Sequence, residues 1–156
     1  CSTAHVNASG GTYSNMLATG ADLAESSLED ATIQLMGMTD DRGLPISVMP
    51  KTLHIPRQEV YNAARILKSI QQSGSANNDV KALNALNVFP GGAKVCHYFT
   101  NADDWFIRTN VMQGMQMFWR KKPMFDQDND FSTKNALASS RMRLSVGCTD
   151  PKSIFG

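Results

Sequence analysis

The chain has 156 residues, enough for one domain with a hydrophobic core of its own. Hydrophobic residues make up 42% and charged residues 19%, a composition typical of folded rather than disordered chains. The net charge of +1 gives no electrostatic reason to expect nucleic acid or an anionic membrane as the main partner. No apolar run is long enough to span a bilayer, so we expect no membrane partner.

Three cysteines, Cys1, Cys96 and Cys148, are widely spaced and odd in number. This count argues against a disulfide framework and favours a reducing compartment. The first residue is Cys1 rather than Met, so we expect either a processed chain or the later part of a longer polypeptide.

Residues 1–20 are rich in Ser, Thr, Gly and Asn and predict an irregular lead-in. A helix is expected to begin near Ser26, because Ser26 and Glu29 have the spacing of a capping box. Its apolar stripe recurs at helical intervals and comprises Leu28, Ala31, Leu35 and Met38.

A short strand is expected at 52–55, followed by a second helix over about 57–71. The predicted buried face of that helix comprises Val60, Ala63, Ala64, Leu67 and Ile70. Residues 71–79 are polar and predict a mobile surface loop.

From residue 93 onward the hydrophobic period changes from that of a helix to that of a strand. Strands are expected at 94–100, 105–110 and 111–119, although the Met-rich last segment is also compatible with a helix. Two helices around a short strand, followed by a mostly antiparallel sheet, indicate an α+β fold.

The C-terminal region predicts a strand, an acidic turn at 126–131 and a second long strand. Over 138–146 the sequence alternates in polarity. One face, expected to be buried, comprises Ala138, Ser140, Met142, Leu144 and Val146. The other face, expected to meet water or another subunit, comprises Ser139, Arg141, Arg143 and Ser145.

Asp126, Asp128 and Asp130 occupy the first, third and fifth positions of a calcium-loop pattern. The pattern then fails, because Phe131 stands where Gly is needed and Leu137 where Glu is needed. A solvated turn is therefore expected, and no metal. No cofactor is expected either, because Gly-Gly-Ala-Lys at 91–94 lacks the spacing and the following helix of a phosphate loop.

Two other classes of function stay open. Cys1 could be the nucleophile of an N-terminal-cysteine hydrolase, activated by its own amine. Cys96 and His97 are neighbours on a predicted strand and point to opposite faces, so they form no dyad, and we expect Cys96 to be a buried structural cysteine. The run at 118–122, Phe-Trp-Arg-Lys-Lys, would suit a small nucleic-acid-binding module. No catalytic residue is predicted.

The chain resembles the major capsid proteins of tailed bacteriophages, in particular the major head subunits of Mu-like prophages. The similar stretches, in chain order, lie at 5–7 (His-Val-Asn), 38–46, 50–56, 105–107 (Trp-Phe-Ile), 130–131, 141–143 (Arg-Met-Arg) and 147–156.

The resemblance implies the Hong Kong-type capsid fold and a C-terminal portion of it, since family members carry a long region before the point where this chain starts. Residues 21–110 would then form an axial-domain-like α+β region, in which the loop at 71–79 would project toward a capsomer symmetry axis. Residues 111–156 would form peripheral-domain-like long strands and the C-terminus.

The implied function is a structural subunit that self-assembles into an icosahedral shell around phage DNA. Its partners would be other copies in hexamers and pentamers, with decoration, portal or scaffolding proteins, and packaged DNA held without sequence readout. The implied location is the virion, with assembly in the cytoplasm of the bacterial host. Candidate subunit contacts are Trp119, Arg120, Arg141 and Arg143, because Arg suits interfacial carboxylates.

Overall fold

The structure is a computed structural model that describes residues 1–71, 80–112 and 114–156. The chain forms two compact units. One comprises Cys1–Met112 with Pro151–Gly156, here called the core unit, and the other comprises Gln113–Asp150, here called the ribbon. Residues 72–79 of the predicted polar loop lie outside the described residues.

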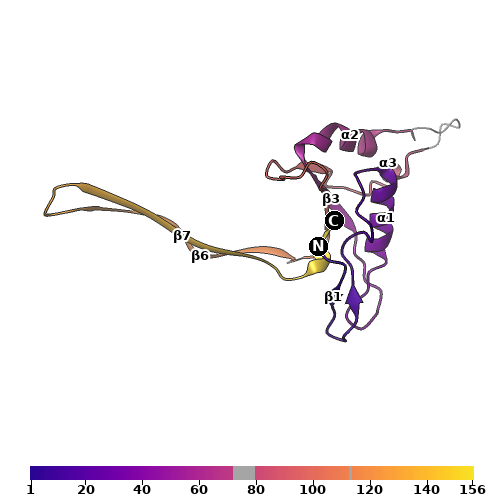
Figure 1. Cartoon of the computed structure of the whole chain (residues 1–156), viewed down its shortest axis with the longest axis horizontal. Helices are drawn as coiled ribbons and strands as arrows, with labels where there is room; N and C mark the ends of the chain where they lie inside the picture. The colour runs from indigo at the N-terminus through magenta and orange to yellow at the C-terminus, as the bar shows by residue number, and fades with distance from the viewer. Residues whose placement is uncertain (72–79, 113) are drawn as a thin grey trace. The chain divides into compact units, whose positions relative to one another are not determined.

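The elements of the core unit mix helices and short strands (Figure 1). In chain order they are β1 (His5–Val6), β2 (Thr12–Tyr13), α1 (Glu25–Met36), β3 (Pro50–Ile55), the 3₁₀ turn η1 (Arg57–Glu59), α2 (Val60–Lys68), α3 (Ala82–Ala85), β4 (Ala93–Val95), β5 (Phe106–Thr109), the 3₁₀ turn η2 (Pro151–Ser153) and β8 (Ile154–Phe155). The ribbon contains β6 (Met115–Asn129) and β7 (Ala136–Cys148). This mixture is the expected α+β class.

The main sheet of the core unit has the strand order β4-β3-β5-β8. The pairings of β3 with β5 and of β5 with β8 are antiparallel, whereas β3 and β4 run parallel. Because β8 is the last strand of the chain, the C-terminus closes the sheet beside β5 and buries Phe155 completely. The sheet is thus mostly antiparallel, as expected, and also contains the parallel pair β3–β4.

One hydrophobic core joins this sheet to α1. Leu28, Ala31 and Leu35 of α1 are fully buried, as are Leu53 and Ile107 of the sheet. The α1 residues recur at three and four positions, which places them on one face of the helix. The apolar stripe predicted for this helix is confirmed for Leu28, Ala31 and Leu35, whereas Met38 is buried but lies beyond the end of α1.

The start of α1 differs from the expected capping box. The helix begins at Glu25. The side chain that forms hydrogen bonds with the backbone at its first turn is that of Ser27 rather than Ser26. The Ser27 hydroxyl oxygen accepts a hydrogen bond from the N–H of Ala24 at 2.9 Å. The same hydroxyl lies 2.8 Å from the carbonyl oxygen of Asp22 and donates toward it.

The second predicted helix is shorter than expected. It ends at Lys68, where Ser69 already has extended backbone, so Ile70 lies outside the helix and is 76% exposed. Ala63 and Ile66 are the buried residues of α2. The prediction included Ala63 but missed Ile66, and it was wrong for Ile70 because it continued the helical period beyond the real end.

The predicted strand at 94–100 is also shorter in the structure, where β4 ends at Val95. The N–H of Cys96 still donates to the Ile55 carbonyl at 2.8 Å, and the chain then leaves the sheet. Cys96 is half-buried rather than buried, which corrects the expectation of a fully buried structural cysteine.

Asn15 ties the N-terminal residues to the C-terminus of the core unit. Its side chain is 1% exposed, and its amide nitrogen donates to the carbonyls of Pro151 and Ile154, both at 3.0 Å. Its amide oxygen accepts from the N–H of Ser2 at 2.7 Å and lies 2.8 Å from His5 Nε2. Residues 1–20 therefore hold fixed contacts in the core unit and include the short β1–β2 pair.

Candidate assembly surface

The ribbon is a pair of long antiparallel strands joined by a short turn (Figure 1). The segment at 115–119, which the sequence left open between strand and helix, is strand. The predicted acidic turn begins later than expected, because β6 continues through Asp126 and Asp128 and ends at Asn129. Only Asp130 of the three aspartates lies in the turn.

The strand register assigns each side chain to a face, because residues directly opposite each other point to the same side of a two-stranded sheet. The register pairs Met117 with Val146 and Trp119 with Leu144. The side that contains these pairs also carries Gln127, Asn129 and Ser140. Its seven large apolar side chains, here called the apolar face, are Met115, Met117, Trp119, Phe125, Met142, Leu144 and Val146.

None of the side chains on the apolar face is buried. Their exposed fractions run from 42% for Trp119 to 64% for Val146. The sequence prediction grouped Met142, Leu144 and Val146 correctly on one face and was wrong in expecting that face to be buried. Alternation shows which residues share a face, but the burial of that face depends on what covers it.

The charged side chains that appear in the strand register lie on the opposite face, here called the charged face. It comprises Lys121, Asp126, Asp128, Arg141 and Arg143, together with Phe118, Met124 and Leu137. Arg141 lies 3.6 Å from Asp126, with both side chains largely exposed. Lys121 and Arg143 lie directly opposite each other, so two like charges meet on this face.

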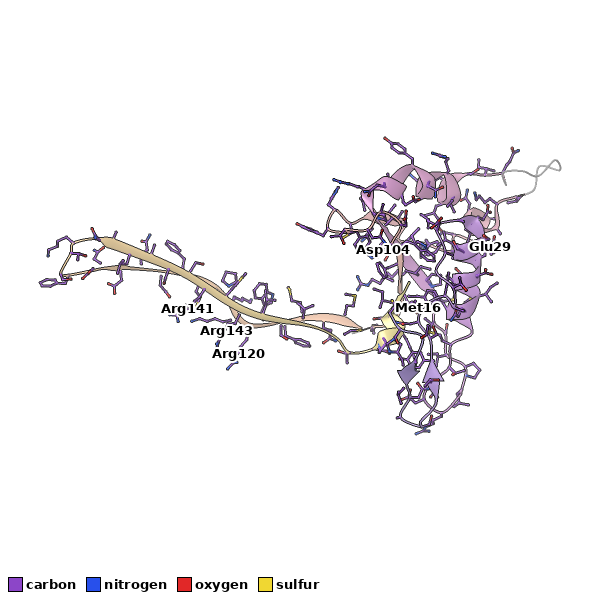
Figure 2. The ribbon with its side chains drawn as sticks, in the orientation of Figure 1. Met16, Glu29, Asp104, Arg120, Arg141 and Arg143 are labelled. Atoms are coloured by element: carbon purple, nitrogen blue, oxygen red, sulfur yellow. The ribbon has the colours of Figure 1, made fainter. Side chains whose placement is uncertain are left out.

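The middle of β6 is irregular. The register with β7 shifts between Trp119 and Lys121 and again between Lys121 and Met124, around Pro123. Such bulges twist a strand and interrupt its hydrogen-bonding edge. Figure 2 shows Arg120, Arg141 and Arg143 gathered along this stretch of the ribbon.

The turn of the ribbon is organised by Asp130. Its carboxylate accepts hydrogen bonds from the Ser132 N–H, the Ser132 hydroxyl and the Thr133 hydroxyl, at 2.7 to 3.0 Å. The hydrogen bonds from Thr133 and then Ser132 lower the pKa of Asp130 to about 2. The carboxylate thus stabilises the turn itself, as expected of an aspartate in a turn.

The hydrolase alternative receives little support from the surroundings of Cys1. Cys1 is exposed at the edge of a cavity of about 420 Å³ whose charged side chains are Asp22, Asp103 and Asp104. Acyl transfer develops an oxyanion, which these carboxylates would repel rather than stabilise. Cys148 is also exposed.

His5 and His54 have hydrogen-bonding partners other than the thiols. His5 Nε2 lies 2.8 Å from the Asn15 amide oxygen, and His54 Nε2 lies 3.3 Å from the Thr52 hydroxyl. Burial, and then the charges of Lys94 and Arg108, lower the pKa of His54. Among the residues that the structure describes, no group of three or more His, Cys, Asp or Glu side chains could hold a metal ion.

The aromatic-basic run at 118–122 does not form one stacking platform. Phe118 pairs with Ser145 on the charged face, whereas Trp119 pairs with Leu144 on the apolar face. Binding of single-stranded nucleic acid requires aromatic rings that are presented to successive bases. The ribbon instead gathers most of its large apolar side chains on one face, an arrangement suited to packing against protein. Within the described parts of the chain, no helix has the length and apolar character to cross a membrane.

Comparisons with known proteins place the chain among capsid proteins. A family model described as "Phage capsid protein" matches residues 2–155. Among solved structures, a virus-like particle from Pyrococcus furiosus matches 90% of this chain and 54% of its own chain, at 12% identity and a TM-score of 0.48. The chain thus spans about half the length of that protein. No curated protein matches the sequence.

Proposed function

The chain belongs to the phage capsid protein family, and from this premise we propose that it is a structural subunit of an icosahedral phage head. Many copies, arranged as hexamers and pentamers, would enclose packaged DNA without reading its sequence. The subunit would be assembled in the cytoplasm of the bacterial host and reside in the virion. Its role would then depend on interfaces rather than on catalysis.

The exposed apolar face of the ribbon is the observation that carries this proposal. A two-stranded ribbon is at best marginally stable in water unless something packs against it. This one nevertheless presents seven large apolar side chains, all more than 40% exposed, including Trp119, Met142 and Leu144. An extended apolar surface of this kind marks a site of protein association.

We extend the proposal to the arrangement of domains. The core unit would correspond to the axial domain of the Hong Kong-type capsid fold, and the ribbon to strands of its peripheral domain. The Mu-like major head subunits are the members of the family to which we assign the chain. The sequence stretches given above support this assignment.

The four predicted contact residues all lie on the ribbon. Trp119 belongs to the apolar face, Arg141 and Arg143 belong to the charged face, and Arg120 lies at the first register shift. We propose that each contacts a neighbouring copy, because Trp and Arg are enriched at protein interfaces.

Sedimentation velocity and electron microscopy of the purified full chain would test the function. Closed polyhedral particles are expected, whereas a monodisperse monomer would overturn the proposal. Replacing Met117 and Val146 by Glu places charges on the apolar face and should prevent particle formation. Ser145→Glu is the matched control, because Ser145 lies on the same strand but on the opposite face.

A further inference from the structure

The two outer edges of the ribbon differ in their capacity to accept another strand. β6 contains Pro123, which has no N–H, and two register shifts, with Lys121 and Lys122 beside them. Proline, lysine and bulges are the features by which proteins protect an edge strand from pairing. β7 (Ala136–Cys148) contains no proline, so its outer edge is open along its length.

The part of β6 nearest the turn, Phe125–Asn129, lacks these protective features and is here called the outer part of β6. From Phe125 to Asn129 its register with β7 is continuous. This segment carries Asp126 and Asp128 on the charged face and Phe125 on the apolar face. It is therefore a regular, acidic stretch of strand that begins just beyond Pro123.

β7 carries the complementary charges at the same spacing. Arg141 and Arg143 are two residues apart on the charged face, as are Asp126 and Asp128. Within the described ribbon, Arg141 forms an ion pair with Asp126, whereas Arg143 lies opposite another cation, Lys121. A carboxylate supplied from outside would relieve this repulsion between like charges.

We propose that the open edge of β7 pairs antiparallel with the outer part of β6 from a second copy of this chain. This proposal rests on the proposed function and specifies one contact of the assembly. In the register we assign, Arg141 lies opposite Asp128 of the second copy and Arg143 lies opposite its Asp126. On the other side of the new sheet, Leu144 then lies opposite Phe125 of the second copy.

In this register, favourable contacts form on both faces of the new sheet. Two Arg–Asp pairs form on the charged face, where charge-assisted hydrogen bonds are strongest in Arg–carboxylate geometry. The Leu144–Phe125 contact extends the apolar face across the boundary between copies. The ladder cannot continue past Pro123 of the second copy, because proline donates no hydrogen bond. Pro123 thus limits the length of the contact, and the Arg–Asp and Leu144–Phe125 pairs select its register.

Pairing between identical strands fits the sequence less well. Two β7 strands paired about Met142 would bring Arg141 opposite Arg143. Two β6 strands paired about Met124 would place Lys122 opposite Asp126, but Pro123 and the register shifts lie at the centre of that ladder. The proposed contact joins two different surfaces, which is the type of interface that generates rings when its rotation closes.

Disulfide trapping between copies provides the first test. In a background with Ser at Cys1, Cys96 and Cys148, one preparation carries Phe125→Cys and the other carries Leu144→Cys. Within one chain Phe125 lies opposite Ser140, four residues from Leu144, a separation of about 13 Å that no disulfide can bridge. Mixed assembly followed by oxidation should give a covalent dimer. The matched control, Phe125→Cys with Ser140→Cys in one chain, should close within the monomer and verifies the ribbon's own register.

Charge exchange provides the second test. One variant carries Arg141→Asp with Arg143→Asp, and the other carries Asp126→Arg with Asp128→Arg. The protein concentration required for assembly should rise at least about tenfold for each variant alone, because like charges then face each other. Mixing the two variants should restore assembly.

The outcomes separate this contact from the function as a whole. Wild-type particles, together with no covalent dimer between Phe125→Cys and Leu144→Cys copies and no rescue on mixing, would overturn the proposed contact and leave the capsid function standing. Failure of the wild-type chain to form particles would overturn both.

Discussion

The ammonium group of Lys81 lies 3.3 Å from the carboxylate of Glu25, which joins the segment before α3 to the first turn of α1. The Lys81 side chain is 6% exposed and that of Glu25 is 21% exposed, so this ion pair lies largely inside the core unit. Removing one member of a buried pair leaves the other charge without compensation, which costs far more than the loss of a surface pair.

Glu25→Gln should therefore lower the free energy of unfolding of the chain by about 2–4 kcal/mol. Lys81→Met should cost less, because it removes the buried charge along with the ion pair. Urea denaturation followed by circular dichroism measures both changes. A Glu25→Gln variant as stable as the wild type would contradict the assigned burial of Lys81.

The second prediction concerns Asn15, which donates to two carbonyls near the C-terminus. Asn15→Asp should destabilise the core unit by about 2–4 kcal/mol, because a carboxylate cannot donate to the carbonyls of Pro151 and Ile154. Differential scanning calorimetry measures the loss. Asn135→Asp, at an exposed position in the ribbon, is the control and should change the melting temperature little.

The third prediction concerns the pH dependence of stability at His54. The folded-state pKa of His54 lies below the ordinary value of 6.5, mainly because of burial and then because of Lys94 and Arg108. The unfolded chain therefore binds a proton more readily, and stability falls as the pH drops through 6.5 toward the folded pKa. Denaturation at pH 7.5 and at pH 5.5, as assay conditions on either side of about 6.5, should show a smaller loss for His54→Gln than for the wild type. Equal losses would show that His54 contributes nothing to the pH dependence.

The helix α1 illustrates what the sequence determines well. Leu28, Ala31 and Leu35 recur at helical spacing, and that spacing alone identifies the side of the helix that meets the core. The ends of helices were harder to predict, because they depend on local contacts. Ser27 rather than Ser26 bonds the backbone at the start of α1, and Ile70 lies outside the end of α2.

The sheet and the ribbon show where a sequence pattern is insufficient. The parallel pairing of β3 with β4 joins residues about forty positions apart, and strand periodicity carries no information about the partner of a strand. In the ribbon the alternation around Met142 and Leu144 predicted the strand and its faces. It could not predict the exposure of the apolar face, which depends on surfaces outside that strand pair. Asn15 escaped notice because a single polar residue in a polar segment gives no periodic signal.

The fourth prediction concerns Asp130, whose carboxylate fixes the turn between β6 and β7. Asp130→Ala removes the acceptor for the Ser132 N–H, the Ser132 hydroxyl and the Thr133 hydroxyl. The turn should then open more often, so the Lys134 N–H, which donates to the Asp130 carbonyl, should exchange with solvent faster. Hydrogen exchange followed by NMR measures this rate.

Acid should reproduce the effect of that substitution in the wild-type chain. The pKa of Asp130 is lowered from 3.8 to about 2, so its contribution is present above pH 3.8 and is lost as the pH falls through about 2. Exchange rates at Lys134, corrected for the intrinsic effect of pH, should therefore converge for the wild type and Asp130→Ala at low pH and separate above it. Asp126→Ala is the control for a charge that lies on the strand, and its exchange rate at Lys134 should equal that of the wild type at every pH. If Lys134 lost protection equally in Asp130→Ala and Asp126→Ala, the turn would be stabilised by the charges of the ribbon rather than by the Asp130 hydrogen bonds.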